Sequence, residues 1–294
     1  MNISHLNGVI DTHVHSAPDV RERKMTDLEL MEAAVKYGVR SMVIKSHAMA
    51  TAGRAVLVNA VREEKYPYSD FVMFGGAVLN SQLGGINPKA AEAALKIGGK
   101  IIWLPTFDSE FTMERAGKSG GVPVVKDGKV TDEVKEVIRL VKEYDAVLAT
   151  GHISPKEIFL VAEAACDLGL KKVVANHPES NLVGLTMEEM KRLAEDYGVF
   201  LEHCFQQPVG GGKYESNESI TLQSVREIGA EHIIIATDAG QKQNPWWYEE
   251  LEESIARLER NGVTKADIDR MTKTNPAYVL GIEAASEAKQ ACIA

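Results

Sequence analysis

The segment Val9-Ile10-Asp11-Thr12-His13-Val14-His15 decides the fold class, because it is the first of eight short apolar runs that each precede a helical pattern. Successive side chains of a strand point to opposite faces, so His13 and His15 share a face, with Asp11 in line behind them. Two imidazoles side by side at the end of a strand can bind one metal ion. A lone His-x-His is more often structural, so the interpretation depends on the segments that follow.

The later segments repeat the strand–helix pattern at intervals of roughly thirty residues. The expected strands cover residues 9–15, 39–45, 71–78, 100–104, 146–150, 172–176, 199–202 and 232–237. Capping signals support the helices between them, since Thr26 stands three residues before Glu29 and Ser154 three residues before Glu157. Eight such units predict an α/β fold, a closed (β/α)8 TIM barrel, in a single domain over residues 1–294.

Two stretches interrupt this alternation. Residues 105–131 form an insertion after the fourth strand, and Asp127-Gly128 predicts the turn of a small hairpin within it. Residues 210–212 are all glycine and predict a loop before the next helix. An open doubly wound sheet is the competing fold, but no Gly-rich phosphate-binding motif follows the first strand.

Composition restricts the classes of partner. The net charge of −9 argues against nucleic acid or an anionic membrane as the main partner. No signal-peptide pattern and no apolar run of membrane-spanning length is present, and three cysteines do not suggest a disulfide framework. We therefore expect a reduced, cytoplasmic enzyme that acts on a small molecule. Barrels of this type often dimerise, so a homo-oligomer is also an expectation.

Titratable residues gather where the expected strands end, which is where the active site of such a barrel lies. Six of the eight histidines fall at these ends, whereas His5 and His232 stand at strand beginnings. The candidates, in chain order, are His13, His15, Lys45, His47, His152, His177, Glu202, His203 and Asp238.

This pattern resembles the amidohydrolase superfamily of metal-dependent hydrolases. The resemblance rests on Asp-x-His-x-His in the first strand, His152, His177 and Thr237-Asp238, and on a closing segment, residues 274–281, that reads Thr-Asn-Pro-Ala-Tyr-Val-Leu-Gly. It implies that His13, His15 and Asp238 hold one divalent metal ion. His152 would complete a one-metal site or, with His177, hold a second ion. The strand-eight aspartate would also take a proton from water.

Zinc is the expected ion, with manganese, iron and nickel as alternatives. In the resemblance Asp238 and His177 are the catalytic candidates, although Asp238 could instead be a helix cap and His177 could be bonded within its own loop. Many two-metal members carry a bridging lysine or glutamate on strand four, but here that strand ends Trp103-Leu104-Pro105-Thr106. Lys45 is the alternative bridge if it is carboxylated, and otherwise a contact for an anionic substrate.

Further residues are predicted as substrate contacts. Arg54 could place its guanidinium fork on a substrate carboxylate or phosphate, although a solvated arginine at a helix start is more common. His47 could also contact substrate. Glu202 and His203 have opposite strand parity, so only one of them is expected to enter the site.

The leading hypothesis is hydrolysis of an amide, a cyclic amide or a lactone by metal-activated water. Non-oxidative decarboxylation of an unsaturated acid is the alternative, since one-metal relatives with the same ligand set perform it. Ester or phosphoester hydrolysis is a third enzymatic class. A silent barrel that serves as a structural subunit is the alternative outside enzymology, and missing ligands would mark it.

Overall fold

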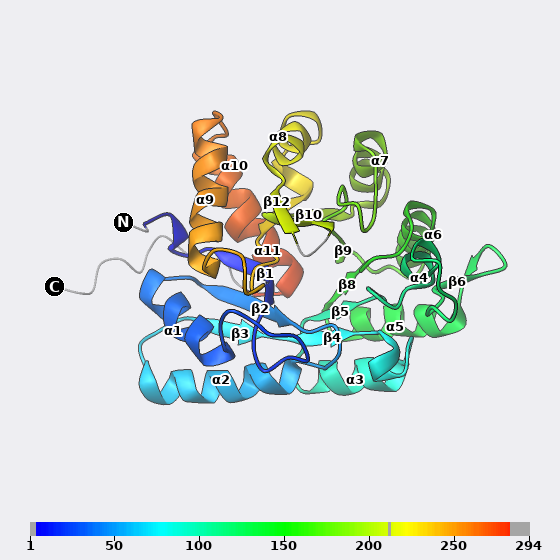
Figure 1. Cartoon of the computed structure of the whole chain (residues 1–294), viewed down its shortest axis with the longest axis horizontal. Coiled ribbons are helices and arrows are strands. Elements are labelled where there is room, and N and C mark those ends of the chain that lie inside the picture. The colour runs from blue at the N-terminus through cyan, green and yellow to red at the C-terminus, as the bar shows by residue number, and fades with distance from the viewer. Residues whose placement is uncertain (1–3, 211–212, 283–294) are drawn as a thin grey trace.

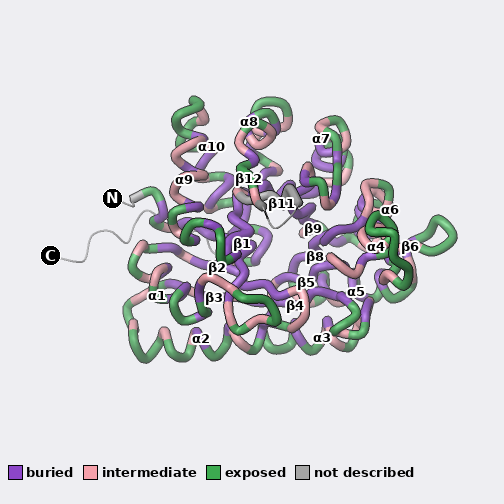
Figure 2. The backbone as a smooth tube through the Cα atoms, in the orientation of Figure 1, coloured by how far each residue is buried: buried purple, intermediate pink, exposed green. Residues whose placement is uncertain are grey.

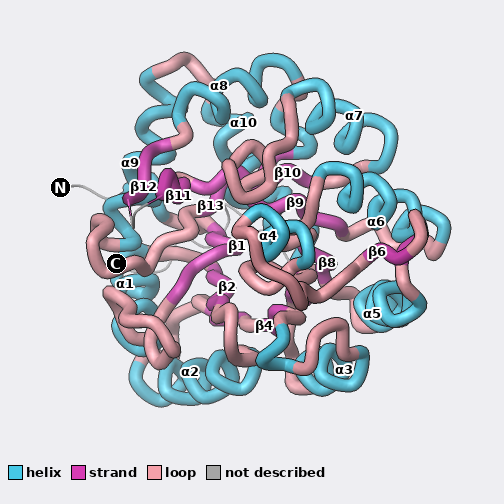
Figure 3. Tube along the Cα trace, turned by 45° about the vertical axis from the view of Figure 1, so that its right-hand side comes forward, coloured by secondary structure: helices cyan, strands magenta, loops and turns pink. Residues whose placement is uncertain are grey.

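The computed structural model of the chain describes residues 4–210 and 213–282. Parallel strands lie at its centre and helices surround them (Figure 1 and Figure 3). The central strands are β1 (Ile10–His15), β2 (Ser41–Lys45), β3 (Val72–Phe74), β4 (Gly76–Val78), β5 (Ile101–Trp103), β8 (Val147–Ala149), β9 (Val173–Asn176), β10 (Phe200–Cys204) and β13 (Ile233–Ala236). The predicted order of strands is confirmed.

The surrounding helices also follow the predicted order. They are α1 (Asp27–Tyr37), α2 (Ala52–Lys65), α3 (Pro88–Lys96), α5 (Asp132–Glu143), α6 (Pro155–Asp167), α7 (Met187–Tyr197), α8 (Glu218–Glu227) and α9 (Trp247–Arg260). The capping boxes at Thr26 and Ser154 are both present. Each helix buries one face against the strands and exposes the other, as the contrast of buried centre and exposed rim shows (Figure 2).

The hydrogen-bonded strands divide into two sheets that adjoin at both edges. One sheet has the order β1-β2-β3 and the other the order β13-β10-β9-β8-β5-β4. At one edge only Gly75 separates β3 from β4. At the other edge an isolated parallel bridge joins Val14 to Ala239, and Asp238 donates its backbone N–H to the carbonyl of His13 at 2.9 Å. The strand order is therefore that of the predicted barrel, but its ladder is not continuous.

Two glycines explain the break between β3 and β4. A Cβ on Gly75 would lie 2.5 Å from the backbone carbonyl of Thr51, and one on Gly76 would lie 1.8 Å from the carbonyl oxygen of Ile101. Neighbouring backbone thus occupies the space of a side chain at both positions. The single strand that the apolar run 71–78 predicts therefore bends here and pairs with a different neighbour on each side of the bend.

An apolar cluster fills the interior of the strand layer. A buried cluster takes one or two residues from each of the eight predicted strands: Ile10, Val43, Val78, Ile101, Trp103, Val147, Ala149, Val174, Phe200 and Ile234. Helix α11 (Asn275–Leu280), which the closing Asn-Pro-Ala segment forms, adds Ala277, Val279 and Leu280 to it. The polar candidate residues lie beyond this apolar cluster, at the carboxyl-terminal ends of the strands.

The insertion contains the predicted hairpin, β6 (Val125–Lys126) and β7 (Lys129–Val130). Asp127 and Gly128 have positive φ angles of 50° and 73°, as a two-residue turn of this type requires. A short helix, α4 (Glu110–Arg115), was not predicted; the Ser109 side chain accepts a hydrogen bond from the backbone N–H of Thr112 at its start.

The expectation of a plain loop at residues 210–212 is wrong in part. Gly210 ends β11 (Gln206–Gly210), which pairs antiparallel with β12 (Lys213–Ser216), whereas residues 211–212 lie outside the described residues. Glycine carries no apolar alternation, so sequence alone does not signal such a hairpin. The helix α10 (Lys265–Asp269) precedes α11. Across the described ranges, every helix is too short or too polar to cross a membrane.

Candidate metal centre

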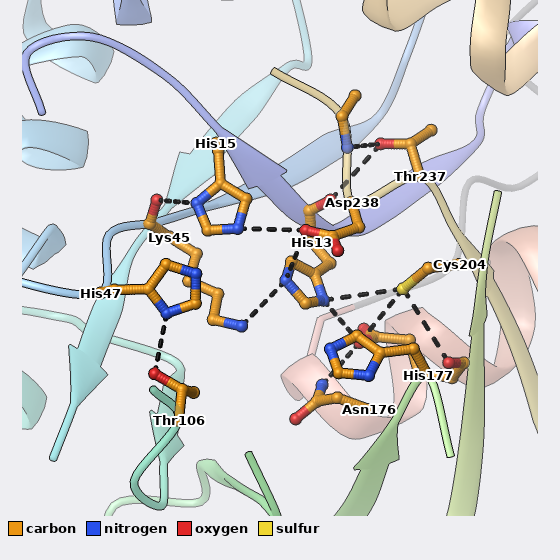
Figure 4. A network of polar contacts seen from close by, with 12 residues as sticks. His13, His15, Lys45, His47, Thr106, Asn176, His177, Cys204, Thr237 and Asp238 are labelled. Atoms are coloured by element: carbon orange, nitrogen blue, oxygen red, sulfur yellow. Dashed lines mark hydrogen bonds and ion pairs between the residues drawn. The ribbon is translucent and has the colours of Figure 1, made fainter. Parts of the chain in front are cut away.

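Strand β1 carries two imidazoles that converge on one carboxylate. The Nε2 atoms of His13 and His15 lie 3.2 and 3.1 Å from Oδ1 of Asp238, two residues beyond β13 (Figure 4). All three side chains are buried. Ligand atoms bonded to a tetrahedral zinc at about 2.0–2.1 Å lie roughly 3.3–3.4 Å apart, so this donor set has the spacing and the chemistry that fit a divalent metal ion.

The outer ring nitrogens of both histidines are held by other groups. Nδ1 of His13 lies 2.9 Å from Oε2 of Glu202, and Nδ1 of His15 lies 3.0 Å from the backbone carbonyl oxygen of Lys45. Glu202 can only accept hydrogen bonds, so it favours the tautomer of His13 in which Nδ1 carries the proton. Nδ1 of His15 faces both the Lys45 carbonyl, which accepts, and Nη2 of Arg23 at 3.2 Å, which donates. The Nε2 lone pair of His13 then faces Asp238, which is the usual arrangement of a histidine that binds metal.

The charges around these donors favour a cation between them. Burial and the Lys45 ammonium lower the pKa of His13, but Asp238 and Glu202 outweigh them and raise it. Burial tends to raise the pKa of Asp238, yet contacts with His13 and His15 hold it well below its usual value. Burial, together with Arg23, lowers the pKa of His15 to about 3, so its imidazole is neutral as metal binding requires.

Two further histidines lie beside this group. His177 follows β9, and its ring centre is 5.8 Å from that of His13 and 5.0 Å from that of His152, which follows β8. Burial lowers the pKa of His177 to about 4 and that of His152 far below its usual value. Nδ1 of His177 contacts Oγ of Ser180 at 3.1 Å, whereas the buried Nδ1 of His152 has no hydrogen-bond partner among the described residues.

Lys45 projects from β2 into the same centre. Its side chain is fully buried, and Nζ lies 3.0 Å from Nε2 of His13 and 5.5 Å from the ring centre of Trp103. Burial lowers the pKa of Lys45, and the carboxylates of Asp238 and Glu202 offset only part of this effect. The amine is therefore adjacent to the nitrogen that would bind a metal ion.

The imidazole of His47 packs against the imidazole of His15. The two imidazoles stack with ring centres 4.9 Å apart, and Nδ1 of His47 contacts Oγ1 of Thr106 at 2.8 Å. The ring of His47 also touches Phe107, at 4.4 Å between ring centres. Burial, followed by the charge of Lys45, keeps the pKa of His47 well below its usual value, so the imidazole is neutral.

Glu202 and His203 point in opposite directions, as their strand parity predicts. Glu202 faces the centre and accepts hydrogen bonds from three donors: Nδ1 of His13, Nδ2 of Asn176 at 2.6 Å and Oγ1 of Thr12 at 2.5 Å. His203 pairs instead with the carboxylate of Glu179 at 3.0 Å. Sequence parity indicated that only one residue enters, but not that the carboxylate would support His13.

Arg54 does not reach this centre. Its Nε and Nη2 atoms lie 2.8 and 2.6 Å from the two oxygens of Asp27, the first residue of α1, and Nη2 also donates to Ser16 at 3.1 Å. The guanidinium fork that was predicted for a substrate anion is thus occupied by a carboxylate of the chain itself, which joins α2 to α1.

Two of the candidate residues have an unusual backbone conformation. Asp238 and His177 have positive φ angles of 53° and 30°, which residues other than glycine rarely adopt. Gly240 permits the turn after Asp238, because a Cβ there would lie 1.8 Å from the carbonyl oxygen of His15. Such strain persists only where surrounding contacts maintain it, and it is typical of functional sites.

Two neighbours of the centre were not among the predicted residues. Cys204, two residues after Glu202 on the same face of β10, places Sγ 3.7 Å from Nδ1 of His13. His13, Glu202 and Cys204 form a second group of potential metal ligands within 4.8 Å of one another. Arg23 lies with Nη2 3.2 Å from Nδ1 of His15. The i, i+2 parity could have signalled Cys204; nothing local signalled Arg23, which stands in a loop.

Residues 8–202 match the model of a family of unknown function, DUF6282. The chain belongs to this family. The matched range includes β1 to β10 apart from the last two residues, and so contains every candidate except His203 and Asp238. No curated protein sequence matches this DUF6282 chain.

Solved structures extend the comparison beyond DUF6282. An amidohydrolase from Pseudomonas aeruginosa is 14% identical, with a TM-score of 0.67 over 95% of this chain and 97% of the relative. An enamidase described as a member of the amidohydrolase superfamily has 14% identity and a TM-score of 0.56 over 96% and 71% of the two chains.

A 2,6-dihydroxybenzoate decarboxylase bound to 2,6-dihydroxybenzoate is also 14% identical, with a TM-score of 0.51 over 93% and 98% of the two chains. These likenesses confirm, at the level of fold, the resemblance to the amidohydrolase superfamily. They also show that chains of this fold include both hydrolases and a decarboxylase.

Proposed function

We propose that this DUF6282 chain is a metal-dependent hydrolase that uses water to cleave an amide, a cyclic amide or a lactone bond in a small molecule. The observation that carries the proposal is the convergence of Nε2 of His13, Nε2 of His15 and Oδ1 of Asp238, with Nδ1 of His13 held by the Glu202 carboxylate. The shared fold of amidohydrolase-superfamily enzymes supports it.

His13, His15 and Asp238 would hold one ion, and His152 would complete this site or, with His177, hold a second ion. Zinc is the expected ion because neutral imidazole and carboxylate suit it, and manganese, iron and nickel share these preferences in part. When bound, the ion would polarise the substrate carbonyl and make water a stronger acid.

Asp238 is the proposed general base. Its Oδ1 atom makes both imidazole contacts, so Oδ2 is the atom that would accept the proton of the attacking water and pass it to the leaving group. The ionised state that proton acceptance requires is favoured, because contacts with His13 and His15 keep the pKa of Asp238 low.

His177 serves in one of two ways that differ in the position of its proton. If Oγ of Ser180 accepts from Nδ1, the Nε2 lone pair is a ligand; if the hydroxyl donates to Nδ1, Nε2–H is a hydrogen-bond donor for the substrate. Each role requires a neutral ring, which the lowered pKa of His177 provides. The number of metal ions per chain distinguishes the two.

One observation favours decarboxylation of an unsaturated acid as the second candidate. Within residues 4–210 and 213–282, neither three-member ligand group includes His152 or His177, so the arrangement suits one ion better than two. With one ion, Lys45 would remain an amine and contact an anionic substrate. With two ions, a carboxylated Lys45 would bridge them, because a free ammonium so close to two cations is electrostatically unfavourable.

Metal content per chain tests the proposal. Protein purified without chelator should contain one or two equivalents of a divalent metal by mass spectrometry, and His13→Ala should lose it. His5→Ala is the matched control, because His5 is exposed and pairs with Glu259 away from the centre. An unchanged metal content in His13→Ala, or none in the wild type, would contradict the metal centre.

Lys45→Ala separates the two candidate reactions. Two equivalents that fall to one in Lys45→Ala would establish a bridging lysine and favour hydrolysis, and cyclic amides and lactones would then be screened as substrates. One equivalent in both proteins would make Lys45 a substrate contact and direct the screen to unsaturated acids as well.

A further inference from the structure

Three arginines that follow β1 in the chain are Arg21, Arg23 and Arg54. The last two form ion pairs within the protein. Arg54 forms a bidentate ion pair with Asp27. Arg23 donates to Asp19 at 2.8 Å, and its side chain is almost completely buried. Neither guanidinium is available to a ligand without breaking an internal ion pair.

Arg21 differs from both. It is exposed, and its guanidinium carbon lies 4.4 Å above the ring centre of Phe107. Among the residues that the structure describes, it takes part in no ion pair. An arginine stacked on an aromatic ring keeps its edge free, so all its N–H groups can reach a planar anion in the plane of the guanidinium.

Phe107 connects this arginine to the metal centre. The ring of Phe107 lies 4.4 Å from that of His47 and meets the ring of His152 edge-on at 5.2 Å. Both imidazoles belong to the cluster around the candidate ligands. One aromatic ring, Phe107, therefore separates Arg21 from the imidazoles of His47 and His152.

The neighbouring charges agree with this placement. Burial and the charge of Asp238 raise the pKa of Tyr214 in β12, and the charges of Arg21 and Arg23 lower it. Arg21 and Asp238 therefore both lie close enough to Tyr214 to act on its charge. Arg21 is exposed, whereas Lys45 is buried within the metal centre itself.

We propose that Arg21 is the specificity residue of this enzyme and binds a carboxylate of the substrate, with Phe107 as the surface on which the guanidinium rests. The proposal deepens the proposed function and rests on it: the substrate class becomes carboxylate-bearing amides, cyclic amides or lactones. A substrate carboxylate bound by Arg21 would orient the scissile carbonyl toward the metal centre.

Binding of two matched hydroxamates to the zinc-loaded protein tests this assignment. Succinic acid monohydroxamate carries a metal-binding group and a carboxylate, and its terminal carboxamide carries the same metal-binding group without the charge. Isothermal titration should show that the wild type binds the acid about tenfold more tightly than the amide, as a charge-assisted bidentate contact would produce.

This preference should disappear in Arg21→Ala and fall in Arg21→Lys, which keeps the charge but loses the fork. The amide should bind both variants as it binds the wild type, which a merely structural change in the loop would not allow. Arg192→Ala is the matched control, because Arg192 also stacks on a phenylalanine, Phe159, but on the remote helix α7. It should retain the full preference.

Two results would overturn the assignment: an equal affinity of the wild type for acid and amide, or a preference that survives in Arg21→Ala. A different result would identify failure of the underlying function. If neither hydroxamate, nor acetohydroxamate, binds the zinc-loaded wild type, the metal centre itself is contradicted, and the assignment of Arg21 falls with it.

Discussion

Glu202 shows how much of the candidate centre depends on a residue that would not itself touch the metal ion. Burial tends to raise its pKa, but the charge of His13 and hydrogen bonds from His13, Thr12 and Asn176 lower it to about 2. The carboxylate is therefore ionised at neutral pH, and it fixes the ring of His13. Because a substrate would have to displace these donors, we interpret Glu202 as a positioning residue.

Glu202→Gln should weaken zinc binding by about 10–100-fold, because the amide keeps only one acceptor oxygen and presents an N–H₂ group to donors. Competition with a fluorescent chelator measures the affinity. The expected loss is one of affinity rather than of fold, and circular dichroism checks that the fold is retained.

Glu179→Gln is the matched control, since Glu179 forms a buried carboxylate–imidazole pair with His203, on the outer face of β10. Its zinc affinity should equal that of the wild type. Equal affinities of Glu202→Gln and the wild type would contradict the positioning role.

At the β3–β4 junction, the observed hydrogen-bonded strands differ from the single strand that the sequence pattern predicts. The run 71–78 predicts one strand, and its residues are buried except for Val72 and Phe74, which are half-buried. Gly75 and Gly76 pack against the backbones of Thr51 and Ile101, so the segment 71–78 bends. Its first half, β3, pairs with β2, and its second half, β4, pairs with β5. The backbone contact, rather than propensity, decides this geometry.

Gly76→Ala should destabilise the protein by about 3 kcal/mol, because the new methyl group meets the carbonyl oxygen of Ile101 and backbone cannot move aside as a side chain can. Urea unfolding measures the difference. Gly53→Ala is the opposite case: the position lies in α2, nothing lies within 4 Å of the new Cβ, and stability should rise by about 0.5–1 kcal/mol. An unchanged free energy of unfolding in Gly76→Ala would contradict the close approach of Gly76 to the backbone of Ile101.

At the scale of the whole molecule, the candidate centre joins the two ends of the strand order. His13 and His15 come from β1, and Asp238 follows β13, more than two hundred residues later. Asp11 also joins β1 to the residues after β13, since its carboxylate accepts hydrogen bonds from Thr237 at 2.7 Å and from the indole of Trp247 at 2.8 Å. A metal ion here would tie β1 to β13 where the ladder is reduced to an isolated bridge.

Zinc at about a hundred times its dissociation constant should therefore add about 2.7 kcal/mol of stability and raise the melting temperature by roughly 5–10 °C. Differential scanning calorimetry with zinc and with a chelator measures the shift. His13→Ala should show no response, whereas His5→Ala should respond as the wild type does. A wild-type melting temperature that zinc leaves unchanged would contradict the tie between the two strands.

Sequence alone determined the order of strands and helices and the end of the barrel at which the polar residues gather. Both follow from local periodicity and from the parallel direction of the strands, which brings all their carboxyl ends to one side. It also determined that His13 and His15 share a face, because strand alternation is a local property.

Only the tertiary structure decided which side chains meet. Arg54 satisfies Asp27 rather than an external anion, Glu202 supports His13, and Arg21 rests on Phe107. Each of these contacts joins segments far apart in the chain, and each depends on side-chain reach and competing partners that no local pattern encodes. The physical reason is that a charged group pairs with the nearest complementary group in space, which the sequence order does not reveal.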